Sequence, residues 1–226
     1  MKIDGPRLDA ASGKAKNLVV FLHGYGADGN DLIAIGREWQ ELLPDTAFVS
    51  PHAPEACAGA PMGRQWFSLT FRDPHERWRG CAQAGPGLDR FLDEELERQG
   101  VAPERLALVG FSQGTMMSLH VGLRRRISPA AILGFSGMLV GPEHLATDAT
   151  ARPRILLMHG THDQVVPFDA LFMATEALAK AEIPAEFHIA HGLGHGIDGE
   201  GLRQGGAFLK AAFKGVKTPQ VAASQG

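Results

Sequence analysis

The segment from Leu106 to Thr115 constrains the fold of this chain more than any other stretch. Its apolar residues run directly into Gly-Phe-Ser-Gln-Gly, with the serine at position 112, and an apolar, helix-competent segment follows at once. This order predicts a short buried strand, a tight turn and a helix. Glycines two residues on either side of Ser112 leave room where strand and helix nearly touch. The pattern therefore predicts a serine held in a strained turn at the carboxyl end of a sheet strand. An ordinary N-cap serine is the alternative.

Apolar strands and amphipathic helices alternate along the rest of the chain. Strands are expected at 17–22, 47–49, 106–109, 130–135, 154–158 and 185–190, and helices at about 32–43, 87–99, 116–123, 168–181 and 200–213. Such alternation predicts an α/β fold, with a mostly parallel central sheet covered by helices on both faces. One domain is expected over 1–215, with a frayed tail over 216–226.

Regular periodicity is lost in an insert near residues 54–80, where aromatic side chains mix with prolines, glycines and charges. A long irregular segment in a compact domain is usually functional or disordered, and the aromatic residues argue against disorder. We expect Trp66, Phe67 and Met62, with Tyr25, to bind substrate by lining an acyl groove above Ser112. The alternative is that the aromatic residues, which also include Phe71 and Trp78, only seal the edge of the core.

Charge and composition exclude several classes of function. The net charge is -3, and the single basic cluster, 124–126, is expected at a helix C-terminus, so no nucleic-acid partner is expected. Neither a secretory signal nor 18 consecutive apolar residues occur, so we expect no stable membrane insertion and a cytoplasmic location. Reduced Cys57 and Cys81 are favoured in that compartment, although a disulfide between them remains open.

Three residues with complementary chemistry follow the ends of predicted strands. Ser112 follows one strand, Asp163 another, and His195 lies after the last strand. The order Ser, Asp, His is the order that α/β-hydrolases use. Because ligands collect outside the carboxyl ends of parallel strands, we expect the three side chains to converge at one sheet edge. Individually, Asp163 has the alternative role of a turn cap, and His195 that of an exposed loop residue.

These residue types suit nucleophilic catalysis. A serine hydroxyl needs a base that takes its proton during attack, and a neutral imidazole does this near neutral pH. A carboxylate that accepts the other ring N–H fixes the tautomer and stabilises the imidazolium. The backbone N–H of Gln113 and a second N–H from the turn 23–25 would bind the oxyanion.

The ten histidines raise the alternative of a metal site. His159, His162 and Asp163, or His191 and His195, have spacings that permit ligation. The first group lies on a strand-to-loop turn rather than on a helix, so its spacing does not place both rings on one face. We therefore expect neither a metal nor a cofactor.

Several sequence blocks resemble the phospholipase/carboxylesterase branch of the α/β-hydrolases, which includes bacterial carboxylesterases and acyl-protein thioesterases. The matching blocks are 21–28, 51–54, 66–67, 110–114, 159–167 and 194–195. The resemblance implies Ser112, Asp163 and His195 as catalytic triad, and the backbone N–H groups of Tyr25 and Gln113 as oxyanion hole. Tyr25, Thr115 and Ser68 depart from the family pattern, which has leucine, glycine and aspartate there in many members.

The expected function is that of a cofactor-free serine carboxylesterase, which hydrolyses small acyl esters through an acyl-enzyme. An acyl-protein thioesterase or a lysophospholipase is the alternative, because all three would use the same triad. The alternative from another functional class is a non-catalytic binding protein with a hydrolase fold. Such a protein would lack a member of the triad, and this sequence has all three. A homodimer is left open.

Overall fold

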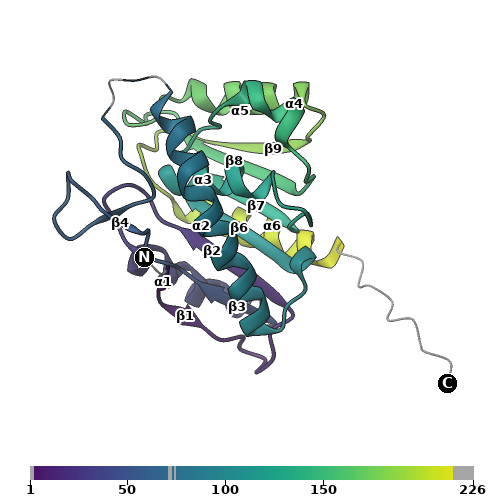
Figure 1. Ribbon diagram of the computed structural model, residues 1–226. Helices are drawn as coiled ribbons and strands as arrows, with labels where there is room; N and C mark the ends of the chain where they lie inside the picture. Colours follow the sequence, from purple (N-terminus) through teal and green to yellow (C-terminus); the bar gives the residue numbers. More distant parts are fainter. Residues whose placement is uncertain (1–2, 71–72, 74, 216–226) are drawn as a thin grey trace.

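The computed structural model describes residues 3–70, 73 and 75–215 and is built around one large sheet (Figure 1). The strands are β1 Arg7–Leu8, β2 Asn17–Leu22, β3 Thr46–Val49, β4 Glu55–Ala56, β5 Arg64–Gln65, β6 Leu106–Phe111, β7 Ala131–Phe135, β8 Arg154–Gly160 and β9 Ala185–Ala190. The α-helices are α1 Gly29–Trp39, α2 Glu76–Gln99, α3 Gln113–Gly122, α4 Leu145–Asp148, α5 Asp169–Lys180 and α6 Gly199–Gly215, and short 3₁₀ turns occupy Pro103–Arg105 and Pro142–His144.

The central sheet has seven strands in the order β1-β3-β2-β6-β7-β8-β9. All of its neighbouring strands are parallel except β1, which pairs antiparallel with β3. The predicted α/β fold with a mostly parallel sheet is therefore confirmed. The parallel arrangement brings the carboxyl ends of β6, β7, β8 and β9 to the same edge.

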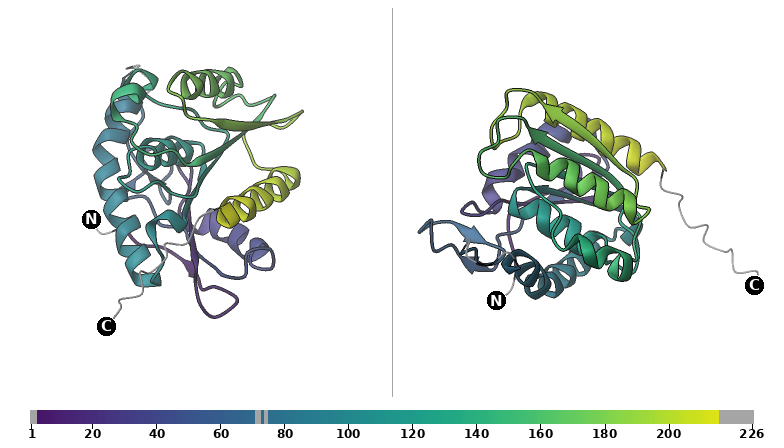
Figure 2. Two further views of the ribbon diagram at one scale, coloured as in Figure 1. Left: turned by 90° about the vertical axis from the view of Figure 1, so that its right-hand side faces the viewer. Right: turned by 90° about the horizontal axis from the view of Figure 1, so that it is seen from above.

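Helices cover both faces of the sheet, as expected (Figure 2). On β2, Leu18 and Val20 face the core under α2 and α3, whereas Val19 and Phe21 face the core under α1 and α6. Successive side chains of a strand point to opposite faces, so a strand buried on both sides must be apolar throughout. This requirement explains the uninterrupted apolar run of 18–22. A third core cluster lies between α3, α5 and β8.

The insert is more regular than the sequence predicted. Its first part forms a small antiparallel ladder, β4 with β5, and α2 begins at Glu76, well before the predicted start near Gly87. The helix continues through Pro86, a residue that breaks helices in isolation. Earlier in α2, a Cβ at Gly80 would lie 2.4 Å from the ring of Phe67, so only a glycine lets the helix approach the insert so closely. Phe71 lies outside the described residues.

Besides β4, β5 and the 3₁₀ turns, the sequence analysis missed two short elements outside the insert. The edge strand β1 is only two residues long, and the loop before β8 contains the helix α4. Neither is long enough to show a hydrophobic period. Among the described residues, no helix is long and apolar enough to cross a membrane. The single domain over 1–215 stays a prediction, and the predicted tail, 216–226, lies outside the described residues.

Candidate active site

Ser112 lies between β6 and α3 in a backbone conformation that few residues adopt. Its φ of 53° and ψ of -114° fall outside the favoured regions for an L-residue, and such strain persists only where the surroundings enforce it. The Ser112 N–H donates to the carbonyl of Phe135 at 2.9 Å, and the Ser112 carbonyl accepts from the N–H of Thr115 at 3.0 Å. The Ser112 side chain makes no capping hydrogen bond to α3, so the hydroxyl is not used as an ordinary N-cap.

The two glycines of the turn are required by close approach. A Cβ on Gly114 would lie 1.7 Å from the carbonyl oxygen of Leu22 in β2, and one on Gly110 would lie 2.4 Å from the Thr115 nitrogen. The Thr115 side chain fits because its methyl group packs against Gly134, which has no Cβ. Its Oγ1 hydrogen-bonds to the carbonyls of Gly110 and Phe135. The departure at position 115 is thus accommodated by local packing.

Asp163 follows β8, and its side chain is fully buried. One carboxylate oxygen, Oδ1, accepts from the N–H groups of Val165 and Val166 at 2.8 and 2.9 Å. The other, Oδ2, accepts from Nδ1 of His195 at 2.8 Å. Burial alone would raise the pKa of Asp163, but the His195 bond and the two backbone donors outweigh it and hold this pKa below its ordinary value. Asp163 therefore caps its turn and orients His195 at the same time.

His195 lies in the loop after β9, as predicted, with its ring 4.9 Å from that of Phe111. Ser136, a residue at the end of β7 with a positive φ of 45°, donates its Oγ hydrogen to the carbonyl of Gly196 at 3.2 Å. This bond ties the His195 loop to the strand beside β6. Among the described residues, no hydrogen bond joins Ser112 and His195; catalytic hydrogen bonds are often long before substrate binds.

His159 is a site residue that the sequence analysis considered only as a metal ligand. Its buried ring points Nε2 at the carbonyl of Val166, 2.9 Å away, and at Oδ2 of Asp163, 3.2 Å away. Because both neighbours are acceptors, Nε2 must carry a hydrogen. Sequence spacing to Asp163 was the only signal that could have linked the two. The described residues contain no group of three or more His, Cys, Asp or Glu side chains placed to hold a metal ion.

The turn that contains Tyr25 lies directly beside Ser112: a Cβ on Gly24 would be 3.4 Å from the Ser112 Cβ. The insert holds this turn in place, because the N–H of Gly26 donates to the Arg64 carbonyl at 2.9 Å and the N–H of Arg64 donates to the Ala27 carbonyl at 2.8 Å. Among the described groups, the backbone N–H groups of Tyr25 and Gln113 have no acceptor, so both are available to a ligand.

The Gln113 side chain connects the serine turn to the insert. Its Oε1 accepts from the backbone N–H of Trp66 at 2.9 Å, and its Nε2 donates to the carbonyl of Phe67 at 2.8 Å. The Trp66 ring lies against the buried His23, whose carbonyl accepts the indole N–H at 3.0 Å. Residues 64–67 thereby contact both turns from which the oxyanion hole was predicted.

The predicted substrate-binding residues differ in their exposure to solvent. Trp66 and Phe67 are only 1% and 3% exposed and belong to the core under α2. Met62 is 91% exposed on the loop between β4 and β5. Trp66 and Phe67 therefore offer almost no surface to an acyl chain in this conformation, whereas Met62 is fully accessible.

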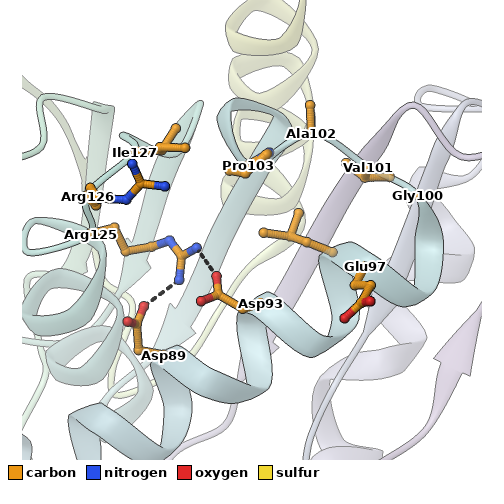
Figure 3. Close-up of a pocket in the computed structure, with 11 residues that line it drawn as sticks. Asp89, Asp93, Glu97, Gly100, Val101, Ala102, Pro103, Arg125, Arg126 and Ile127 are labelled. Atoms are coloured by element: carbon orange, nitrogen blue, oxygen red, sulfur yellow. Dashed lines mark hydrogen bonds and ion pairs between the residues drawn. The ribbon is translucent and has the colours of Figure 1, made fainter.

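A groove of about 620 Å³ lies away from the serine turn, between the end of α2 and the segment after α3 (Figure 3). Arg125 points into it from the segment after α3 and forms ion pairs with Asp89 and Asp93 of α2. These ion pairs join the two segments, and Arg126 is a second cationic residue that lines the groove. None of the predicted site residues lines it.

Comparisons with known proteins agree with this geometry. The model of one protein family, described as Phospholipase/Carboxylesterase, matches residues 4–213. The chain is 29% identical to esterase YpfH of Escherichia coli over 90% of this chain and 86% of the relative. It is 27% identical to acyl-protein thioesterase 1 of Gibberella zeae, over 91% and 94%. The crystal structure of esterase PE8 superposes with a TM-score of 0.91 at 45% identity, covering 94% of this chain and all of that one.

Proposed function

Because this chain belongs to the phospholipase/carboxylesterase family and is a carboxylic ester hydrolase, we propose that Ser112, His195 and Asp163 form its catalytic triad. The observation that carries the proposal is the 2.8 Å bond from His195 Nδ1 to a buried carboxylate at the sheet edge where Ser112 stands in its strained turn. The bond fixes the tautomer that leaves Nε2 free to accept a proton.

In the proposed reaction, Ser112 Oγ attacks the ester carbonyl and His195 Nε2 takes the hydroxyl proton. The carbonyl oxygen becomes an oxyanion, which accepts from the backbone N–H groups of Tyr25 and Gln113. The C–O bond then breaks, and His195 returns the proton to the departing alcohol, leaving an acyl-enzyme. Water, deprotonated by the same imidazole, attacks the acyl carbon and releases the carboxylic acid and the serine.

Small acyl esters are the proposed substrates, and the exposed Met62 is the proposed contact for the acyl chain. We retain Trp66 and Phe67 as substrate-binding residues only if the insert moves, since both are buried. An acyl-protein thioesterase is the second candidate, because one relative carries that name; a lysophospholipase would use the same residues. Values of kcat/KM for matched oxygen esters, thioesters and lysophospholipids of equal acyl length would separate the three.

A fluorophosphonate probe tests the proposed nucleophile. The wild-type protein should be labelled on Ser112 and lose its esterase activity in parallel. Ser112→Ala should remain folded, fail to react with the probe and lose activity by about a millionfold. Pure Ser112→Ala protein that keeps more than about a tenth of the wild-type activity would exclude Ser112 as nucleophile.

We also propose a cytoplasmic location, which the two buried free thiols, Cys57 and Cys81, support. A homodimer remains part of the proposal, and mass measurement in solution tests it.

A further inference from the structure

Strand β9 is an edge strand of the sheet. It pairs with β8 on one side, and no strand among the described residues pairs with its other side. The carbonyl of Ala190 accepts from the N–H of Thr161 at the end of β8, so the backbone groups of Ala190 face inward. Because these directions alternate along a strand, the backbone groups of His188 and Glu186 also face β8. Those of Ala185, Phe187 and Ile189 point away from the sheet.

Exposed aromatic rings lie beside this open edge. Phe187 is 49% exposed and Phe172 of α5 is 42% exposed, and their rings meet edge to face with centroids 6.0 Å apart. Phe168 continues the row inward, 5.2 Å from Phe172. Met173, the neighbour of Phe172 on α5, is 68% exposed. An open edge is a template for pairing with another chain, and natural proteins usually protect it with charges, proline or bulges. The apolar border of this edge therefore points to a partner.

We propose that a second copy of this chain pairs with the edge, its β9 antiparallel to the first β9 about a twofold axis at Phe187. In that register the two Phe187 residues exchange both backbone hydrogen bonds, and Ala185 of each copy pairs with Ile189 of the other. The strands thereby form one continuous sheet. Phe187 of one copy lies directly across from Phe187 of the other, next to the two Phe172 rings.

Backbone direction and charge together select this register. A shift by one residue would oppose an outward-facing residue to an inward-facing one and lose the ladder. A shift by two residues in one direction would place Glu186 opposite Glu186 of the second copy, and like charges directly opposite are destabilising. The proposed register instead places each Glu186 opposite His188 of the second copy. Glu186 Oε1 already accepts from Arg154 of its own chain at 2.8 Å, so the imidazole N–H would donate to the other carboxylate oxygen.

The surface is thus self-complementary in backbone pairing and charge, which favours a second copy over an unrelated protein or a lipid surface. A twofold interface requires such self-complementarity. Both serine turns remain outside the proposed contact, since Ser112 follows β6, three positions away in the sheet order. Catalysis and dimer formation can therefore be measured separately.

Sedimentation velocity of the full chain gives the first test. The wild-type protein should sediment with twice its chain mass of 24.2 kDa. Phe187→Asp should yield monomers, because two carboxylates would face each other at the axis. Ala11→Asp introduces the same charge at an exposed residue between β1 and β2, at the opposite edge of the sheet, and should remain dimeric. Both variants should keep the wild-type circular dichroism spectrum and esterase activity, whether or not Ser112 is the nucleophile.

Charge exchange tests the register. Glu186→Lys and His188→Glu should each raise the dimer dissociation constant at least about tenfold, and the double variant should restore the wild-type value. Phe187→Cys should form a disulfide-linked dimer on mild oxidation, since paired residues at about 5.5 Å can form the bond. Met62→Cys should not, and the buried Cys57 and Cys81 should not interfere. A monomeric wild-type protein at about 100 μM, or a dimer unaffected by Phe187→Asp and not cross-linked through position 187, would overturn the proposal.

Discussion

His159 and His195 direct ring nitrogens at the same oxygen, Oδ2 of Asp163, from 3.2 and 2.8 Å. Three hydrogen bonds reach the buried carboxylate, from His195 and from the backbone N–H groups of Val165 and Val166, whereas the hydrogen bond of His159 Nε2 goes to the Val166 carbonyl. Hydrogen bonds to a charged carboxylate spread its charge and stabilise it. The N–H dipole of His159, with its nitrogen 3.2 Å from Oδ2, still stabilises the negative charge of Asp163, and His159 acts on the proposed base through that carboxylate.

We predict that His159→Phe moves the acid limb of the kcat/KM–pH profile to higher pH. Without the N–H dipole beside Oδ2, the charge of Asp163 is less stabilised by its surroundings, so the carboxylate attracts the imidazolium form of His195 more strongly. His159→Gln, which keeps an N–H donor at a similar reach, should restore most of the wild-type profile. A His159→Phe enzyme with lower stability but an unchanged pH profile would show that His159 serves packing alone.

The two histidines that flank the loop after β9 should differ in function. His195→Ala should lower kcat/KM by several orders of magnitude, up to about a millionfold, because the proposed base is lost. His191→Ala should retain most of the activity, because this exposed residue has no contact with Asp163. Steady-state assays of both variants on one ester provide the comparison, and the reverse pattern would require a different triad.

Gln113→Leu should lower kcat more than it raises KM. The substitution keeps the backbone N–H of residue 113 but removes both side-chain bonds to the backbone of Trp66 and Phe67. We expect a loss in kcat of about 10- to 100-fold, less than the loss of a complete oxyanion donor. Gln65→Leu is the matched control, because this buried glutamine bonds Glu55 and Ser68 rather than the serine turn. Equal effects of both variants would mean that the insert does not position the serine turn.

His120 should make the protein less stable in mild acid. The residue is 7% exposed, and burial lowers its pKa from 6.5 to about 4. Below pH 6.5 the unfolded chain therefore binds a proton that the folded protein excludes, so the free energy of unfolding should fall as the pH drops from 6.5 to about 4.

His120→Phe should remove this part of the pH dependence, which amounts to at most a few kcal/mol. The Nδ1 atom of His120 has no hydrogen-bond partner among the described groups, so the substitution leaves no bond broken there. Urea unfolding at pH 7 and pH 5 measures the difference, with His191→Phe as an exposed control. Parallel losses of stability in the wild-type protein and in His120→Phe would contradict the prediction.

The sequence by itself determined the order of the elements and the place of the serine, aspartate and histidine along the chain. Strands such as 17–22 are buried on both faces, and a local apolar run reveals that directly. Gly110 and Gly114 predicted the tight turn at Ser112 from adjacent residues alone, since no side chain fits at either position. Three strand ends in a parallel sheet then had to meet at one edge.

Only the tertiary structure decided what surrounds those residues. No local sequence pattern predicts that α2 continues through Pro86 or that Trp66 is buried. The same is true of the hydrogen bond from Trp66 to Gln113 and of the contact between His159 and Asp163. Local propensities are set by a residue and its nearest neighbours, whereas these features depend on packing free energy shared between distant segments. For β9, too, the residues predicted a strand, but only the order of strands in the sheet showed that it is an edge strand.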